Sequence, residues 1–192
     1  MTSPPPAYSR PSGVDSRRFR HVFGHFGTGV TVITVADADG PAGFACQAFA
    51  PLSLDPPLVL FCPQSGSDTW RRIRAAGTFC VNILASDQRD ISRLFGTRGT
   101  DRFAALDLTS APSGAPVLTG ALTWADCTVD AVHPGGDHVV VIGRVTSLGP
   151  CRDAAPLLFH RSRYTTTTPV SPYEPPEVVD TLLSWPRHTD WI

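Results

Sequence analysis

The sequence predicts a mainly β fold, a closed or partly closed antiparallel barrel with about three short helices. Six or seven segments have the alternating or β-branched pattern of strands, whereas only three short segments have helical spacing. Because strands and helices do not alternate regularly, a doubly wound parallel sheet is not expected. The 192 residues are enough for one domain with a sizeable core, and closing the sheet would remove its exposed edges.

The chain begins with a predicted tail and a first helix. Residues 1–14 include four prolines, and we expect them to form a disordered tail. Asp15 or Ser16 can cap the helix that follows, and Gly27 and Gly29 are expected to end it. Four apolar residues fall on one face of this helix: Phe19, Val22, Phe23 and Phe26.

Three extended segments come next. Val30–Val35 reads as a strand, and a turn at 37–41 connects it to a second segment, 43–53, so that the two resemble a hairpin. Asp55-Pro56-Pro57 lacks two amide donors and is expected to break the sheet there. Leu58–Cys62 follows as a short apolar strand.

Two helices flank the next strand, Thr78–Leu84. The polar loop 63–68 opens the first helix, which Gly77 should close. The second helix runs from about Asp87 to Phe95. The stretch 98–120 is loop-rich, and three long β-patterned runs follow it: Leu122–Val132, His138–Leu148 and Leu157–Tyr164. We therefore expect one domain over residues 15–166 and a C-terminal extension over 167–192.

Composition narrows the functional classes. A formal net charge of -1 gives no electrostatic reason to expect nucleic acid or an anionic membrane as a partner. All 16 basic residues are arginines, so a side-chain cation that meets an anion here is a guanidinium or a histidine. The five cysteines form no CxxC pair, and no signal peptide is recognisable, which favours the cytoplasm. No apolar run approaches the roughly 20 residues of a membrane span.

Common catalytic motifs are missing from the sequence. It has no Rossmann glycine fingerprint, no phosphate-binding P-loop and no GxSxG nucleophile motif. His21 and His25 lie four apart on the first helix, but no carboxylate or cysteine accompanies them, so we expect no metal site.

Three segments are candidates for ligand binding, each with an ordinary structural alternative. Residues 43–57 are mostly small, which suits a flat ring against the backbone but also a close-packed strand pair. The loop 65–69 precedes a helix, where free amides can bind an anion or Ser67 can simply cap the helix. Asp137 could orient His138 toward a ligand, although glycine-rich turns with Asp are common in hairpins.

Six motifs, taken in order, resemble those of the short-chain NAD(P)H:flavin oxidoreductases with the split-barrel fold. They span about residues 19–164 and are Phe26-Gly27-Thr28-Gly29-Val30-Thr31-Val32, Gly43-Phe44-Ala45-Cys46-Gln47-Ala48-Phe49, Ser53-Leu54-Asp55-Pro56-Pro57-Leu58-Val59, Phe79-Cys80-Val81-Asn82-Ile83-Leu84, Gly136-Asp137-His138 and Pro156-Leu157-Leu158-Phe159. The Cys46-Gln47 pair and the terminal Asp190-Trp191-Ile192 are most similar to actinobacterial reductases that serve phenol or steroid-ring hydroxylases.

The resemblance implies a cytoplasmic homodimer that binds flavin between its subunits and supplies reduced flavin to a separate monooxygenase. It implies FMN, with FAD as the alternative, and NADH, with NADPH as the alternative. His138, and less directly Tyr164, would face the nicotinamide. The family's lysine near the phosphate is missing, so backbone amides or an arginine such as Arg93 would replace it. The remaining implied flavin contacts are Pro41, Gly43, Phe44, Ala45, Cys46, Gln47, Ala48, Cys62, Pro63, Gln64, Ser67, Asp68 and Thr69.

In this family the hydride passes directly from nicotinamide to flavin, so the lack of an acid, base or nucleophile motif is expected. Two alternatives stay open at this point. One is an oxidase of the pyridoxamine-phosphate type, for which the chain lacks the necessary Lys and Arg constellation. The other is a flavin- or haem-binding module without turnover.

Overall fold

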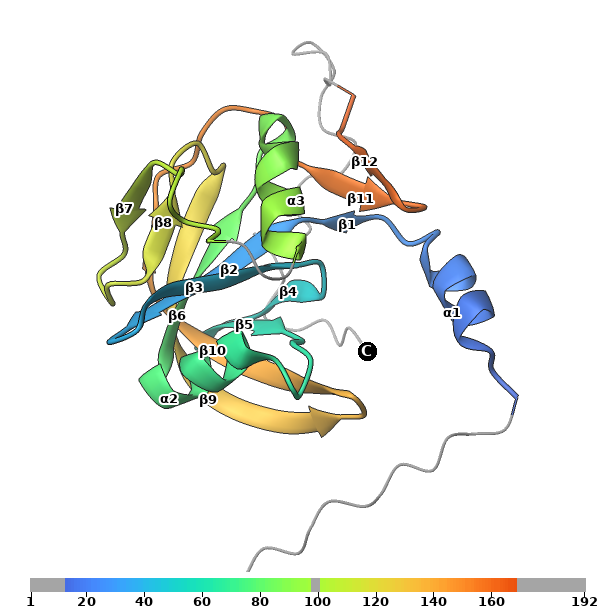
Figure 1. The fold of residues 1–192 in the computed structure, drawn as a ribbon, viewed down its shortest axis with the longest axis horizontal. Coiled ribbons are helices and arrows are strands. Elements are labelled where there is room, and N and C mark those ends of the chain that lie inside the picture. Colours follow the sequence, from blue (N-terminus) through green and yellow to red (C-terminus); the bar gives the residue numbers. More distant parts are fainter. Residues whose placement is uncertain (1–12, 98–100, 169–192) are drawn as a thin grey trace, which may run out of the picture.

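The structure, a computed structural model, describes residues 13–97 and 101–168 (Figure 1). The helices are α1 (Ser16–Phe23), α2 (Asp68–Ala76) and α3 (Arg89–Gly96), and a short 3-10 helix, Ser86–Gln88, leads into α3. The strands are β1 (Thr28–Gly29), β2 (Thr31–Asp37), β3 (Gly40–Cys46), β4 (Phe49–Leu54), β5 (Pro57–Phe61), β6 (Thr78–Ile83), β7 (Leu108–Ser110), β8 (Pro116–Leu118), β9 (Thr123–Gly135), β10 (His138–Leu148), β11 (Leu158–His160) and β12 (Arg163–Thr165). The predicted mainly β fold is confirmed.

Seven antiparallel strands form the main sheet, in the order β3-β2-β6-β9-β10-β5-β4. Its two edge strands, β3 and β4, are consecutive in the chain and are joined only by the bend at residues 47–48. The sheet therefore curls until its edges approach each other, yet no ladder joins β3 to β4 in the part of the chain that the structure describes. This arrangement is a split barrel, and smaller sheets of β1-β11-β12 and β7-β8 flank it.

Helix α2 is fixed by its caps and by its apolar face. Ser67 accepts a hydrogen bond from the Trp70 amide at 3.3 Å, and Gly77 ends the helix with a φ of 71°, a conformation that glycine adopts easily. Trp70 and Ile73 are buried in the main core, where the Trp70 ring lies 6.4 Å from that of Phe61. The packing holds the N-terminus of α2 close to the split in the barrel.

A buried polar network ties β8 to the main sheet. The Asn82 side-chain amide donates to the carbonyls of Val32 and Pro116, and its oxygen accepts from the Leu118 amide at 2.8 Å. Thr34 Oγ1 also donates to the Pro116 carbonyl, at 2.6 Å. Because every partner is satisfied, the network stabilises the core although it is polar.

Some expected boundaries were wrong. The segment 43–53 is not one strand, because the bend at 47–48 divides β3 from β4. The prolines at 56 and 57 do not interrupt the sheet. Leu54 pairs with Pro57, so Asp55-Pro56 is the tight turn of a β4–β5 hairpin, where the prolines interrupt no ladder hydrogen bond.

Three more differences concern chain segments outside the main sheet. α1 begins after the predicted cap Asp15 but ends at Phe23, since Gly24 takes the capping position instead of Gly27. The last β-run is divided into β11 and β12 by a turn in which Arg161 and Ser162 have φ values of 49° and 62°. The loop-rich stretch 98–120 contains the short strands β7 and β8, which are too brief for a periodic pattern.

The predicted tail and C-terminal extension lie outside the described residues, apart from positions 13, 14, 167 and 168, and so remain predictions. No helix within the described ranges is both long and apolar enough to cross a bilayer.

Candidate functional site

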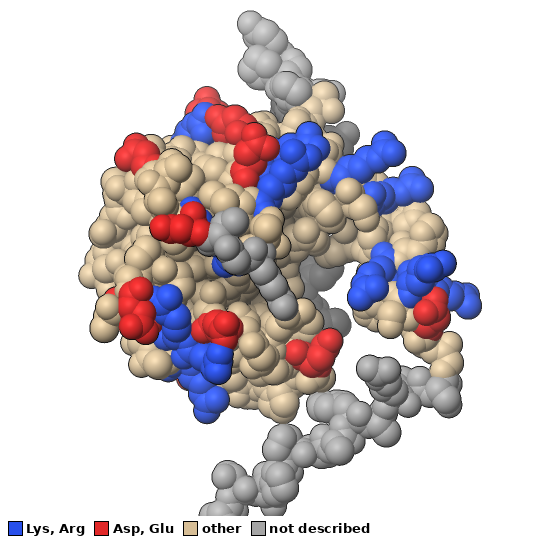
Figure 2. Space-filling view, viewed as in Figure 1, with Lys and Arg blue, Asp and Glu red and all other residues tan. Residues whose placement is uncertain are grey.

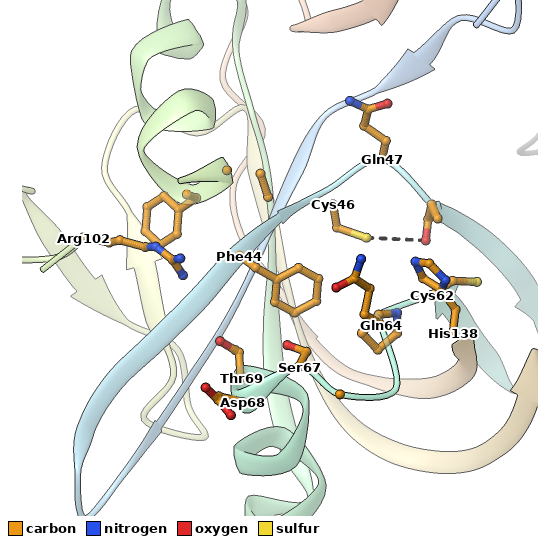
Figure 3. Close-up of a pocket in the computed structure, with 16 residues that line it drawn as sticks. Phe44, Cys46, Gln47, Cys62, Gln64, Ser67, Asp68, Thr69, Arg102 and His138 are labelled. Atoms are coloured by element: carbon orange, nitrogen blue, oxygen red, sulfur yellow. Dashed lines mark hydrogen bonds between the residues drawn. The ribbon is translucent and has the colours of Figure 1, made fainter. Parts of the chain in front are cut away.

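A cavity of about 760 Å³ lies at the split of the barrel, between β3, the end of β5 and the N-terminus of α2 (Figure 3). This volume is typical of small-molecule sites. Its walls are formed by Phe44, Ala45, Cys46, Gln47, Ala48, Cys62, Pro63, Gln64, Gly66, Ser67, Asp68, Thr69, Phe95, Gly96, Arg102 and His138. The structure thus brings together all the predicted site residues except Pro41, Gly43, Arg93 and Tyr164.

Small residues along β3 and the bend after it shape one wall of the cavity, which we call the flat wall. A Cβ atom added to Gly43 would lie 2.9 Å from Phe95 Cε1 and 3.0 Å from the Ile33 carbonyl oxygen, so only glycine allows α3 to approach β3 this closely. Beyond it, Ala45 and Ala48 present only methyl groups to the cavity. A planar ring could therefore lie against this wall.

Two cysteines fix the bend that forms the edge of this wall. The Ala48 carbonyl accepts hydrogen bonds from the Cys62 amide at 3.0 Å and from Cys46 Sγ at 3.6 Å. Burial raises the pKa of the Cys46 thiol to about 11 and also raises the pKa of Cys62. Both thiols are neutral near pH 7, so they shape the wall and are not nucleophiles.

The N-terminus of α2 forms one end of the cavity. Ser67 caps the helix, as one of the two interpretations of this loop predicted, and Thr69 faces the same end (Figure 3). The Asp68 side chain is 82% exposed and forms an ion pair with Arg71, so it does not fill the cavity with negative charge. The amides of the first helical turn and the helix dipole make this end suitable for an anion.

His138 lies at another part of the cavity wall, near Cys62 and Gln64 (Figure 3). Its Nδ1 is 2.8 Å from Asp137 Oδ1, so Asp137 orients the imidazole as the sequence suggested. Backbone hydrogen bonds join the neighbouring loop to the start of β10: the Val139 amide donates to the Pro63 carbonyl at 3.0 Å, and the Ser65 amide donates to the Asp137 carbonyl at 3.0 Å. The histidine and the cavity loop therefore form one rigid unit.

Arg102 is a site residue that the sequence analysis missed. Its Nη1 donates to the Gly43 carbonyl at 2.6 Å and its Nε donates to the Thr97 carbonyl at 3.0 Å, which holds the guanidinium at the cavity wall. It is the only arginine among the cavity-lining residues that the structure describes. No periodic pattern surrounds it in the sequence, and only its charge could have drawn attention to it.

The four remaining predicted residues lie elsewhere. Arg93 pairs with Asp90 at 3.5 Å and stacks over the Tyr164 ring, away from the cavity. The Tyr164 hydroxyl is 3.0 Å from Ser92 Oγ, so it too is directed away from the cavity. Pro41 and Gly43 line a second, smaller cavity of about 220 Å³, together with Ala42, Thr69, Asp101, Arg102 and Phe103. Because Thr69 and Arg102 line both cavities, the two adjoin at the anion-binding end.

The site contains no metal constellation. Among residues 13–97 and 101–168, no group of three or more His, Cys, Asp or Glu side chains could hold a metal ion. The ring of His21 in α1 lies 5.3 Å from that of His25, just after the helix, edge to face, and the expectation of no metal site there stays a prediction.

A split barrel whose cavity combines small wall residues with an anion-binding helix end suits the binding of a phosphorylated ring compound. Residues 23–168 match the model of the flavin reductase like domain, and the chain belongs to this family.

Named relatives agree with this assignment. The chain is 53% identical over 156 residues to the flavin-dependent monooxygenase reductase subunit HsaB of Rhodococcus jostii, covering 81% of this chain and 80% of the relative. Its fold is similar to that of nitrilotriacetate monooxygenase component B from Mycobacterium thermoresistibile, with a TM-score of 0.79 and 48% identity over 88% of this chain and 96% of that one. It is also similar to the NADH:FAD oxidoreductase SgcE6 of Streptomyces globisporus, solved with NAD and FAD fragments, with a TM-score of 0.78 and 34% identity over 81% and 94%. The resemblance to actinobacterial reductase components is confirmed.

Proposed function

We propose that the protein is the reductase component of a two-component flavin-dependent monooxygenase. It oxidises a nicotinamide dinucleotide, reduces a free flavin and releases the reduced flavin to a separate oxygenase. The observation that carries the proposal is the cavity itself, which combines a flat wall at Ala45 and Ala48 with an anion-binding helix end at Ser67. When flavin is bound, its ring accepts the hydride directly, so the protein only binds and orients two rings.

The ring of the flavin would lie against β3 and the bend at 47–48. The small side chains of Ala45 and Ala48 and the neutral thiols of Cys46 and Cys62 would leave room for the ring beside the backbone of this edge strand. The phosphate would then lie at the N-terminus of α2, where Ser67, Thr69 and Arg102 are among the polar side chains that line the cavity. Arg102 takes the role that the sequence analysis assigned to Arg93.

Both FMN and FAD are expected to be substrates. The anion-binding end supplies contacts for the phosphate that riboflavin lacks. The second cavity begins at Thr69 and Arg102 and continues past the phosphate position, which leaves room for the adenylyl half of FAD. SgcE6 is named as an NADH:FAD oxidoreductase, which supports FAD as a second flavin substrate.

NADH is the expected electron donor. His138 would contact the nicotinamide, since it lies at the cavity wall and is 39% exposed. SgcE6 is named an NADH:FAD oxidoreductase, which supports NADH as the donor.

A homodimer and a cytoplasmic location complete the proposal. Helix α1 exposes apolar side chains that a second copy could cover, among them Phe19 at 53% and Phe23 at 59% exposure. All five cysteines are free thiols, as expected in a reducing compartment.

The test is NADH oxidation by purified protein with riboflavin, FMN and FAD added in turn. Saturable NADH oxidation that requires added flavin, with lower KM values for FMN and FAD than for riboflavin, is the expected result. A coloured protein that holds flavin tightly but does not oxidise NADH would indicate a storage module. Turnover of a phosphorylated pyridoxine-type amine by tightly bound FMN would indicate an oxidase. Either of these two results would overturn the proposal.

A further inference from the structure

Eleven of the thirteen arginines among the described residues fall into two groups; Arg74 in α2 and Arg102 at the cavity belong to neither. Arg71, Arg72, Arg144 and Arg152 lie on the barrel, and each pairs with a carboxylate. A second group lies at one edge of the molecule, where Figure 2 shows positive charge gathered over α1, the β11–β12 hairpin and α3. We call this group the arginine edge; it consists of Arg17, Arg18, Arg20, Arg89, Arg93, Arg161 and Arg163, and only Arg93 has a carboxylate partner within the described ranges.

Direct contacts hold the three segments of the arginine edge together. The Arg161 amide donates to the Gly24 carbonyl at 2.7 Å, which joins the hairpin turn to the end of α1. The Tyr164 ring joins the hairpin to α3, because the guanidinium carbons of Arg89 and Arg93 lie 5.3 Å and 6.0 Å from its centroid. Segments that are far apart in the sequence thus lie side by side and bring their arginines to one edge of the molecule.

The arginine edge borders the cavity. Phe95 and Gly96 at the end of α3 line the cavity, and Arg93 is on the same helix. On the other side, Thr28 Oγ1 donates to Oε1 of the lining residue Gln47 at 3.5 Å, and Thr28 pairs with Phe159 of the hairpin. An anion attracted to this surface is therefore already next to the cavity.

The positive charge of this surface is local. The whole chain has a formal net charge of -1, yet Asp15 and Asp90 are the only carboxylates in α1 with its cap, in α3 and in the β11–β12 hairpin. Unpaired guanidinium groups around a cleft raise the local concentration of anions and the rate at which they enter.

We propose that the arginine edge steers phosphate-bearing substrates, the flavin nucleotide and the nicotinamide dinucleotide, into the cavity. This inference rests on the proposed function, since it takes these molecules as substrates. The edge acts on the rate of association and not on the bound state, because its guanidinium groups do not line the cavity.

The test compares association rate constants of FMN and of riboflavin, measured by stopped-flow quenching of flavin fluorescence. Riboflavin has the same ring without the phosphate, so it reports every effect except the electrostatic one. The variant is Arg161→Gln/Arg163→Gln. The matched control is Arg74→Gln/Arg144→Gln, which removes the same charge from α2 and β10, away from the edge. Equal melting temperatures verify that both variants are folded.

At about 0.01 M salt, where the screening length is about 30 Å, we expect the edge variant to bind FMN about threefold more slowly than the wild type. Its rate constant for riboflavin should be unchanged, and the control should bind both flavins at the wild-type rate. At about 0.15 M salt the difference for FMN should largely disappear.

An edge variant that binds FMN at the wild-type rate, or that slows FMN and riboflavin equally, would overturn the inference. Unchanged association with free flavin would point instead to an acidic protein surface as the partner of the edge. Failure of the proposed function is distinguishable, because the wild-type protein would then oxidise no NADH with any flavin.

Discussion

The guanidinium of Arg102 donates a 2.6 Å hydrogen bond to the backbone carbonyl of Gly43, 59 residues earlier in the chain. The bond joins the loop after α3 to the strand that forms the flat wall of the cavity. It also places a fixed positive charge where the large and the small cavity adjoin.

Arg102→Gln should weaken the binding of phosphorylated flavins. Charged hydrogen bonds are worth about 1.5–3 kcal/mol, so the KM for FMN should rise at least about tenfold. The KM for riboflavin should stay within about twofold of the wild-type value, because riboflavin has no phosphate that could contact Arg102. Arg144→Gln, which removes a charge paired with Asp130 on the barrel, is the control and should leave both values unchanged. If the KM for riboflavin rose as much as that for FMN, Arg102 would only support the wall.

His138→Ala should impair the use of NADH more than the binding of flavin. The loss of one imidazole contact, about 1 kcal/mol, predicts a KM for NADH about fivefold higher, with the dissociation constant of FMN unchanged. Steady-state kinetics and a fluorescence titration measure the two quantities. His133→Ala on the exposed part of β9 is the control. Unchanged turnover at low NADH would contradict the role assigned to His138.

Asn82→Leu should destabilise the barrel without touching the cavity. The substitution leaves the buried Leu118 amide without its acceptor, which costs about 1–3 kcal/mol, and removes one of the two donors to the Pro116 carbonyl, which keeps that of Thr34. We expect the free energy of unfolding to fall by about 3 kcal/mol in urea titrations. Thr109→Ala, on the exposed strand β7, should change it by less than about 0.5 kcal/mol. If the free energy of unfolding of Asn82→Leu fell by less than about 1 kcal/mol, the network would not be a stabilising element.

Alkaline pH should destabilise the protein through its buried thiols. Burial raises the pKa of Cys46 from 9.0 to about 11, so the folded state keeps a proton that the unfolded state loses. The resulting stability is complete below pH 9.0 and is lost as the pH rises to about 11, a total on the order of 3 kcal/mol. Unfolding free energies of the wild type and of Cys46→Ala, compared across this range, should converge as the pH rises. If the unfolding free energies of the wild type and of Cys46→Ala instead changed in parallel with pH, the role assigned to the Cys46 thiol would be contradicted.

The thiols should also differ in reactivity. At pH 8 a thiol reagent should modify the exposed Cys151 quickly and leave the buried Cys80 and Cys127 unmodified until the protein unfolds, because only the thiolate reacts. Burial raises the pKa of Cys127 to about 12, in agreement with this order. Peptide mapping after a short labelling reaction identifies the modified residue. Early labelling of Cys127 would show that the barrel opens at that strand.

The parts of the fold that local sequence predicts are those whose determinants are close together in the chain. Ser67 and Gly77 cap α2 at the expected positions, and the pattern of Thr31–Asp37 forms a strand. The loop before α2 and the segment 43–48 are local features as well. For this reason their place in the site could be predicted, although the ring-binding interpretation of 43–48 depended on the resemblance.

The parts that sequence did not predict depend on contacts between distant segments. Arg102 reaches the site only through Gly43, and nothing near either residue in the sequence indicates this contact. Arg93 seemed equally suitable as a cation, but its helix turns it toward Tyr164. Likewise, the apolar spacing predicted a helix that included Phe26, whereas α1 ends at Phe23, and Phe19 and Phe26 are both exposed in the single chain.

The central claim is that a flavin ring is reduced while it lies against the wall formed by Ala45, Ala48 and the thiol of Cys46. The most direct measurement is the anaerobic rate of FMN reduction by NADH with wild-type protein and with Ala48→Trp, whose indole would fill the cavity without entering the core. We predict that the variant keeps the wild-type melting temperature and loses at least about a hundredfold in rate. Reduction at the wild-type rate by a folded Ala48→Trp protein would mean that the flavin binds elsewhere.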